Sequence, residues 1–297
     1  GVNMGRKTGL ATVGGAWTGT PKIGRSAGAT SDYFKGSMDD VRIYNRALSM
    51  SEVSALYNYS SAKVNASQAY IPPTPTTNLQ SGLVGFWDFS AGKMGTTSAY
   101  DASGNNNTGW LIGGVKKVIG KIGQGLSFDG STGYVSATAV VETIPASYSI
   151  SVWVRPTAMN VSLSNDIVSL WDGAQTLGCL LIETGDGSTN KVRFLHRPVC
   201  GAGGGDSFYS NTSLVAGRWY HLVMTRNSTS KLMTTYINGV YDNSITGTAG
   251  DFTQTPSLMN IGESASSRYW NGLIDEVRIY NRALSQAEVT SLYRLGK

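Results

Sequence analysis

The residues of this chain that could carry nucleophilic or acid–base chemistry are few. Its 297 residues include only two histidines, His196 and His221, and two cysteines, Cys179 and Cys200. A serine or cysteine nucleophile needs a neighbouring base. His221 lies in the apolar and aromatic run 219–223, which favours a structural role, and His196 is interpreted as a more open surface or binding histidine on a strand. The sequence therefore does not favour nucleophilic catalysis.

Paired carboxylates are the second source of catalysis. Glycoside hydrolysis uses two carboxyl groups about 5–9.5 Å apart across a cleft. Asp275 and Glu276 are adjacent on a predicted strand. Because neighbouring side chains of a strand point to opposite faces, we expect these two carboxylates not to converge. The chain is therefore predicted not to be an enzyme.

Aromatic side chains outside the predicted core are candidates for ligand binding. Sugar sites combine exposed aromatic rings with polar groups that fix hydroxyls. One Trp-Asp pair lies in a predicted loop, and one tyrosine follows the glycine-rich stretch 201–205. The predicted binding residues are Trp171, Asp172, Arg193, His196 and Tyr209; the alternative for each is an ordinary structural or surface residue.

Composition limits the remaining classes of function. The chain has 37 Gly, 15 Tyr and 7 Trp but only 14% charged residues, a composition typical of strands and turns. The net charge is +5, yet Lys and Arg are scattered singly, which argues against nucleic acid. No apolar run approaches the roughly 20 residues of a membrane span. The chain starts at Gly1 without a signal segment, so we expect any targeting signal to have been removed. Cys179 and Cys200 either pair in an oxidising compartment or are two small buried residues.

Short β-rich segments separated by turns predict the elements that must position these side chains. The strands are expected near Leu83–Phe89, Leu126–Phe128, Tyr134–Ser136, Tyr148–Val154, Asp166–Leu170, Gly178–Glu183, Lys191–His196, Trp219–Arg226, Met233–Ile237 and Ser257–Ile261. Asn238-Gly239 is a strong hairpin signal, and residues 184–190 supply a second turn. Many short antiparallel strands predict an all-β, two-sheet sandwich.

The end of the chain predicts a last strand and one short helix. Residues 275–280 alternate, which describes a strand with one buried side. Ser285 and Glu288 have the spacing of a capping box, and Leu284 with Val289 that of a hydrophobic staple. The helix is expected to run to about Tyr293.

An internal repeat organises the sequence. Residues 36–57 recur as residues 272–293 with about two-thirds of positions identical. Between the copies, residues 59–80 are rich in Pro, Ser and Thr, which predicts a semi-stiff linker. We therefore divide the chain into residues 1–58, a C-terminal fragment of a first domain, the linker 59–80, and a complete domain at 81–297.

Seven motifs in a fixed order resemble the laminin-G-like, concanavalin A-like jelly-roll domains of bacterial extracellular proteins. They lie at residues 82–89, 101–106, 125–135, 149–154, 217–223, 236–239 and 272–281. The resemblance covers Leu83 to Tyr293, whereas the first copy matches only the last quarter of the family. It implies a jelly-roll with Trp87, Trp153, Trp219 and Trp270 in the core. Enzymes of this fold carry an alternating Glu-x-Asp-x-x-Glu, which is absent here.

The resemblance also implies a calcium site. In related sandwiches an Asp at the start of the last strand and a glycine carbonyl bind the ion, which matches Asp275 with Asp129 or the carbonyl of Gly130. The alternative is that Asp129 caps a turn and Asp275 only ends a strand. We expect an extracellular or cell-surface binding module, stabilised by calcium, whose partner is a glycan or a surface protein. The alternative is a structural or adhesive repeat that self-associates through residues 1–58.

Overall fold

The computed structural model describes the second predicted domain in most of its length. The described residues are 23, 24, 34, 36 and 41 singly, then 78–137, 146–158, 165–171, 178–185, 190–201, 203–253, 256, 258–264 and 268–297. The chain divides into two compact units, Gly1–Ala69 and Tyr70–Lys297. The predicted fragment 1–58 and almost all of the linker 59–80 therefore lie outside the described residues.

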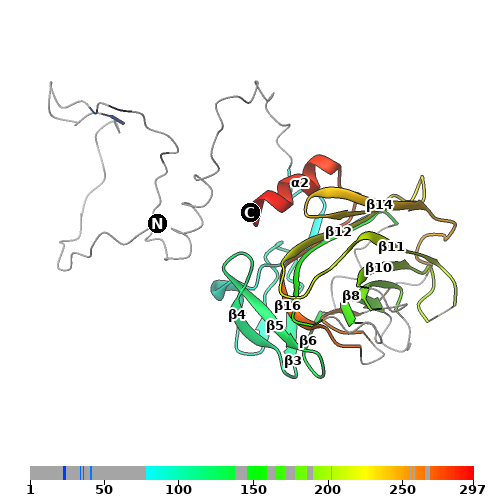
Figure 1. Cartoon of the computed structure of the whole chain (residues 1–297), viewed down its shortest axis with the longest axis horizontal. Helices are drawn as coiled ribbons and strands as arrows, with labels where there is room; N and C mark the ends of the chain where they lie inside the picture. The colour runs from blue at the N-terminus through cyan, green and yellow to red at the C-terminus, as the bar shows by residue number, and fades with distance from the viewer. Residues whose placement is uncertain are drawn as a thin grey trace. The chain divides into compact units, whose positions relative to one another are not determined.

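Two antiparallel sheets of eight strands each form a sandwich (Figure 1). The first sheet has the order β14-β13-β12-β7-β16-β5-β4, and β1 also pairs with β16. Its strands are β1 (Leu83–Trp87), β4 (Lys116–Ile119), β5 (Gln124–Asp129), β7 (Tyr148–Pro156), β12 (Tyr220–Arg226), β13 (Leu232–Ile237), β14 (Val240–Thr246) and β16 (Asn271–Tyr280). The last strand in sequence is thus central, which is the topology of a jelly-roll.

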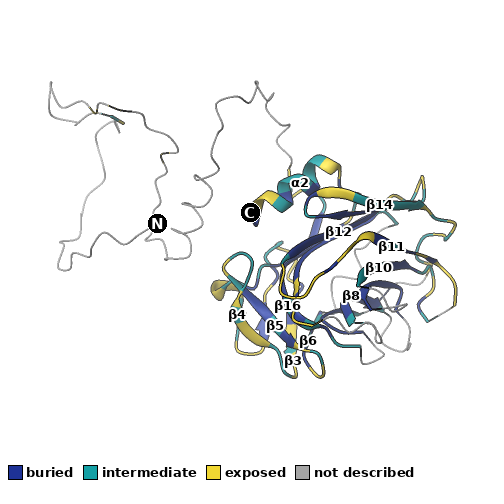
Figure 2. Cartoon of the chain, in the orientation of Figure 1, coloured by how far each residue is buried: buried dark blue, intermediate teal, exposed yellow. Residues whose placement is uncertain are grey.

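The second sheet has the order β11-β10-β9-β8-β15-β6-β3-β2. Its strands are β2 (Ser98–Ala99), β3 (Gly109–Ile112), β6 (Tyr134–Ala137), β8 (Asn165–Trp171), β9 (Leu180–Thr184), β10 (Lys191–His196), β11 (Asp206–Ser213) and β15 (Leu258–Ile261). A short 3-10 helix, η1 (Ala91–Lys93), follows β1. Aliphatic and aromatic side chains from both sheets fill the core, with Trp87 and Trp270 among its largest fully buried members. Strand β12 is coloured as buried in Figure 2.

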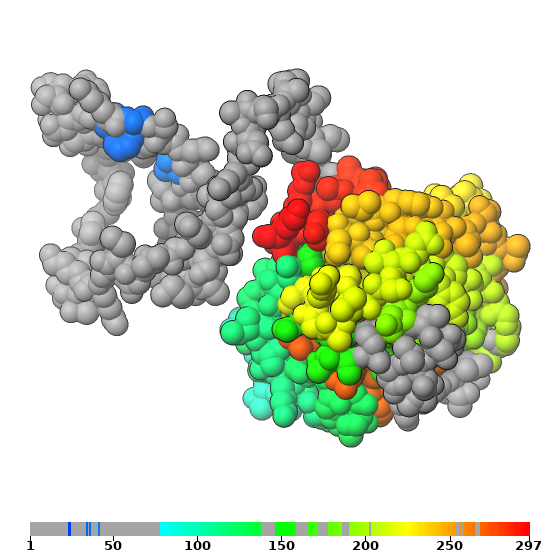
Figure 3. All heavy atoms as spheres, viewed as in Figure 1, coloured from blue at the N-terminus to red at the C-terminus, as the bar shows by residue number. Residues whose placement is uncertain are grey.

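The C-terminal helix α2 (Gln286–Leu295) packs on the first sheet. Both bonds of the predicted capping box between Ser285 and Glu288 are present. Leu284 and Val289 are buried together with Tyr280 in a second apolar cluster, which confirms the staple. Figure 3 shows the helix beside the strands around β14. Among the described residues, no helix is long and apolar enough to cross a membrane.

The predicted sandwich is confirmed, and the differences lie at its edges. All ten segments expected between Leu83 and Ile261 are strands, and Asn238-Gly239 forms a hairpin turn with positive φ at both residues. The predictions missed β2, β3, β4, β11 and β14, of which β2, β4, β11 and β14 are edge strands. Trp87, Trp153 and Trp270 are buried as expected, whereas Trp219 is only half-buried.

The strict alternation assumed for Asp275 and Glu276 is wrong. A β-bulge between Asp275 and Arg278 shifts the register of β16 against β7, and Glu276 adopts φ 56°. The extra residue of a bulge changes the direction in which the neighbouring side chains point. Glu276 forms an ion pair with Arg278, and its charge contributes to the raised pKa of Asp275. Their separation therefore cannot be argued from strand periodicity.

Candidate functional site

Four polar side chains form a row across the second sheet. Tyr209, Arg193, Glu183 and Asp166 are direct cross-strand partners on β11, β10, β9 and β8. They alternate with Phe208, Phe194 and Ile182, which point into the core. The row therefore lies on the face turned away from the core, which we call the outer face of the second sheet.

Two arginines neutralise the two carboxylates of this row. Arg193 Nη1 lies 3.0 Å from Glu183 Oε1. Arg268, from the segment between β15 and β16, places Nε 3.0 Å from Asp166 Oδ2 and Nη1 3.2 Å from Glu183 Oε2. The Ser264 hydroxyl donates to Asp166 Oδ2 at 2.6 Å. Both carboxylates are fully buried, whereas the guanidinium groups remain partly exposed.

The electrostatics of this network follow from burial. Burial and the adjacent Glu183 carboxylate hold the pKa of Asp166 above its usual range, although Arg268 and Ser264 act against them. A like charge beside Asp166 disfavours the ionised form of that carboxyl group. The row thus presents guanidinium groups at the surface over a compensating acidic layer.

Aromatic rings continue the outer face on the other side of Arg268. Tyr269 follows Arg268, and its ring centroid lies 6.4 Å from that of Tyr134 on β6. Trp110 on β3 is the cross-strand partner of Ser136 and is 54% exposed. Rings held on strands and partly open to water can stack on the apolar face of a ligand without much loss of conformational entropy.

The structure brings together some of the predicted binding residues. Arg193 and Tyr209 are neighbours in the row, and Trp171, half-buried, ends β8 on the same face because Leu170 before it points into the core. Asp172 lies outside the described residues. The interpretation of His196 as an open histidine is wrong, because its side chain points into the interior and is fully buried.

His196 has a defined internal role. Its Nε2 donates to the Gly250 carbonyl at 2.8 Å, since a carbonyl only accepts, so Nδ1 accepts from the Tyr148 hydroxyl at 3.1 Å. Burial lowers the pKa of His196 to about 4. This histidine is therefore a neutral link between the sheets.

His221 is buried as the sequence predicts. Its Nε2 lies 2.8 Å from the Ser151 hydroxyl, a distance found between nucleophiles and their bases. The His221 ring packs against the rings of Trp153 and Tyr293, and both His221 and Ser151 are buried. Among the described residues, no group hydrogen-bonds to Nδ1 to orient the ring. Burial, followed by the charge of Arg278, lowers the pKa of His221 to about 3. The pair presents no nucleophile to a substrate.

The predicted calcium ligands are not brought together. Asp129 pairs with Asn271 on β16, and Asp275 lies four residues further along that strand, about 13 Å away. Asp129 accepts hydrogen bonds from the amides of residues 131–133 and from the Thr132 hydroxyl, as a turn cap does. Gly130 has φ 74° and donates to the Trp270 carbonyl.

Asp275 is fully buried and also engages backbone amides. Its Oδ2 accepts from Lys121 and Ile122, and its Oδ1 from Glu276. Burial raises its pKa to about 8 in spite of these donors. Among the described residues no three His, Cys, Asp or Glu side chains gather as metal ligands. The residues as placed do not fit one shared calcium ion.

Chelation of divalent ions tests whether calcium stabilises the chain. We expect EDTA to leave the melting temperature of the chain unchanged, because the carboxylate oxygens of Asp129 and Asp275 already accept amide hydrogens. The measurement is thermal unfolding in EDTA and in millimolar calcium. A rise in melting temperature with calcium that Asp275→Asn abolishes and Asp129→Asn preserves would instead place an ion at Asp275 alone.

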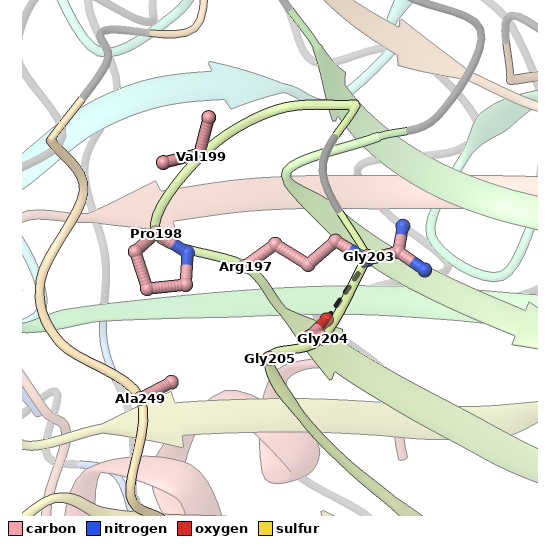
Figure 4. A pocket seen from close by; sticks show the side chains of 7 residues that line it. All are labelled: Arg197, Pro198, Val199, Gly203, Gly204, Gly205 and Ala249. Carbon is pink, nitrogen blue, oxygen red and sulfur yellow. Dashed lines mark hydrogen bonds between the residues drawn. The ribbon is translucent and has the colours of Figure 1, made fainter.

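A small cavity lies beyond the end of β10 (Figure 4). Its volume is about 260 Å³, and it is lined by Arg197, Pro198, Val199, Gly203, Gly204, Gly205 and Ala249. Ligand pockets usually measure about 300–1,000 Å³. The cavity therefore suits a substituent of a ligand better than a whole oligosaccharide. The partly exposed side chains of the outer face, among them Trp110, Tyr134 and Tyr269, form the larger candidate surface.

Sequence reasoning missed several members of the outer face. They are Trp110, Tyr134, Asp166, Glu183, Arg268 and Tyr269. Alternation within the predicted strand at 134–136 could have placed Tyr134 outward. The contact between Asp166 and Glu183 depends on strand register, and Arg268 lies in an irregular segment for which the sequence offers no signal.

The stacked antiparallel sheets and central last strand define a jelly-roll sandwich. The chain belongs to the concanavalin A-like lectin/glucanases superfamily, whose family model matches residues 1–54 and 129–290. A search of curated proteins found no match. The family assignment agrees with the motifs that carry the resemblance.

Several solved structures are similar to the chain in fold. The binding domain of Paraclostridial Mosquitocidal Protein 1 is 21% identical with a TM-score of 0.57, covering 72% of this chain and 52% of that one. Domain 4 of AbnA, an extracellular arabinanase from Geobacillus stearothermophilus in complex with arabinotriose, is 22% identical with a TM-score of 0.53, covering 72% and 98%. The binding domain of Botulinum neurotoxin DC in complex with rat synaptotagmin II is 17% identical with a TM-score of 0.58, covering 73% and 52%. The chain thus spans about half the length of the two toxin domains.

Proposed function

We propose that this chain is an extracellular carbohydrate-binding module whose ligand lies on the outer face of the second sheet. The observation that carries the proposal is the combination, on one face, of partly exposed rings with fixed polar groups: Trp110, Tyr134 and Tyr269 beside the arginine and carboxylate row. Aromatic platforms with a few oriented polar groups are the usual means of binding sugars.

The other faces and the cysteines support this choice. Helix α2 buries the outward residues Val223, Tyr236 and Tyr280 of the first sheet. On the second sheet, the outward Trp110, Tyr134 and Tyr269 stay partly exposed. Cys179 and Cys200 form a disulfide, as is usual for proteins of oxidising compartments such as the cell exterior. The arabinotriose complex of one similar structure supports a sugar ligand, while the synaptotagmin complex of another keeps a surface protein as the alternative.

Glycan-array binding followed by titration calorimetry tests the proposal. We expect Trp110→Ala and Tyr134→Ala each to weaken binding of the identified glycan about tenfold, since buried aromatic contacts commonly cost 1–2 kcal/mol or more when truncated. The matched control is Tyr241→Ala, which removes a ring of equal exposure, 54%, from β14 of the first sheet. Absence of any bound glycan, or an equal loss in the control, would contradict the proposal.

The alternative function, assembly through residues 1–58, stays a prediction because that segment lies outside the described residues. Light scattering of the whole chain at rising concentration tests it. A monomer at all concentrations would count against assembly and leave carbohydrate binding unaffected.

A further inference from the structure

No carboxylate among the described residues forms an ion pair with Arg197. Arg197 follows β10, and its side chain is half-buried. Its Nε donates to the Gly204 carbonyl at 3.2 Å, and its Nη1 donates to the Gly178 carbonyl at 3.0 Å. A guanidinium has five N–H donors and is always charged in proteins, so three donors and the full charge remain after these two bonds.

The backbone around Arg197 holds this guanidinium in place. The Cys179–Cys200 disulfide ties the start of β9 to the loop that follows β10. The amide of Arg197 donates to the Cys179 carbonyl at 2.7 Å, and Gly204 has φ 93°, a left-handed conformation that favours glycine. The carbonyl groups of Gly178 and Gly204 both belong to segments next to the disulfide. The Arg197 guanidinium that they bind is therefore pre-organised before any ligand binds.

The local field around Arg197 is positive. Burial lowers its pKa first, and repulsion from Arg193 and Arg268 lowers it further, while only Glu183 acts in the opposite sense. Arg193 and Arg268 are both ion-paired with Glu183, so this carboxylate is already shared. An anion beside Arg197 would therefore gain attraction from three guanidinium groups, while the two nearby carboxylates, Glu183 and Asp166, are already ion-paired with Arg193 and Arg268.

We propose that Arg197, supported by Arg193 and Arg268, forms a subsite for a carboxylate group on the glycan, so that the ligand is an acidic saccharide such as a uronic acid polymer. A guanidinium matches a planar carboxylate through two parallel hydrogen bonds, which a neutral hydroxyl cannot reproduce. The aliphatic stem of Arg197 lines the small cavity, with the guanidinium beside Gly203 and Gly204 (Figure 4). The inference rests on the proposed function and names its ligand class.

Matched polymers test the ligand class. Polygalacturonate and its fully methyl-esterified form have the same backbone but differ in charge, and a sulfated galactan carries a tetrahedral anion instead. We expect polygalacturonate to bind at least about tenfold more tightly than the ester, as one charge-assisted hydrogen-bonded pair can account for. We also expect this preference to shrink as salt is raised, because partly exposed charges are screened.

Arg197→Gln is the decisive variant, because glutamine can still donate to one carbonyl but carries no charge. We expect it to lose about tenfold in affinity for polygalacturonate and to bind the ester as before. The control is Arg155→Gln on β7 of the first sheet, an exposed arginine whose Nε likewise donates to a glycine carbonyl, that of Gly217 at 2.9 Å. Thermal unfolding of both variants verifies that they fold.

Each outcome separates the inference from the proposed function. Equal binding of polygalacturonate and its ester, or binding of neutral glycans alone, would overturn the acidic subsite and leave carbohydrate binding intact. A preference for the sulfated polymer would overturn the carboxylate. Binding of poly-glutamate but of no saccharide would overturn both proposals. Should Arg197→Gln not fold, Arg197→Lys replaces it, and we expect lysine to keep the salt dependence but lose most of the carboxylate preference over sulfate.

Discussion

A variant of this chain without histidine is expected to lose less stability in acid than the unmodified chain. His196 and His221 have folded-state pKa values of about 4 and about 3, against 6.5 in the unfolded chain. Above pH 6.5 both states are neutral at these positions. As the pH falls through 6.5 the unfolded chain binds two protons that the folded chain cannot take up, so stability is lost down to about pH 4 for His196 and about pH 3 for His221.

The expected difference is large. One pH unit corresponds to about 1.4 kcal/mol for each group, so the two histidines together cost about 4 kcal/mol of unfolding free energy at pH 5. Native domains have only about 5–15 kcal/mol in total. A loss of this size is a large part of that total.

Urea unfolding at several pH values measures the effect. The raised pKa of Asp275, about 8, acts in the opposite sense, because the folded state then holds a proton that the unfolded state releases. The comparison is therefore between the unmodified chain and the double variant His196→Gln/His221→Gln, in which the contribution of Asp275 cancels. Parallel stability curves for the two proteins between pH 4 and pH 7 would contradict the prediction. If the double variant does not fold, proton NMR of the two imidazoles should show no titration down to pH 5.

The fold could be predicted from sequence where strands bury one face in the core. Segments such as 148–154 and 220–226 carry continuous or alternating apolar residues, and both are central strands. The missed strands are different. β11 is almost entirely polar, β14 has no buried residue, and β4 begins with two exposed lysines. Edge strands bury little, so hydrophobic periodicity gives no signal for them.

The candidate site could be predicted only residue by residue. Arg193 and Tyr209 were found as single polar and aromatic residues, but their pairing comes from the register of β10 against β11. The prediction of an open His196 is wrong, although alternation could have corrected it: His196 lies two positions after the inward Phe194 on β10, and residues two apart on a strand share a face. Arg268 reaches the row from an irregular segment, which no periodicity describes.

The outer faces of the two sheets carry different kinds of side chain. On the first sheet, Val223, Tyr236 and Tyr280 turn away from the main core and are buried again under α2. On the second sheet, the corresponding outward positions carry buried carboxylates beneath partly exposed arginines. A buried ionic layer adds little net stability compared with an apolar one. The layer does hold the guanidinium groups of Arg193 and Arg268 at the surface.

We expect a second large effect, a loss of folding stability, when Arg268 is removed from the buried carboxylates of this layer. Arg268→Gln removes the cation that bridges Asp166 and Glu183, both fully buried, at 3.0 and 3.2 Å. Removing one partner of a buried pair leaves an uncompensated charge and typically costs about 3–5 kcal/mol. Because Arg193 still contacts Glu183 at 3.0 Å, we expect the lower end of this range, about 3 kcal/mol.

Chemical denaturation of three variants isolates the cause of this loss. Arg218→Gln, an exposed arginine in the turn before β12, is the control and is expected to change the unfolding free energy by less than about 0.5 kcal/mol. In the Arg268→Gln background, adding Asp166→Asn should recover part of the loss, because the neutral amide no longer needs the cation. Equal stability of Arg268→Gln and Arg218→Gln would contradict the prediction. A loss that the double variant does not recover would be traced to the contact of Arg268 with Glu183 and not to that with Asp166.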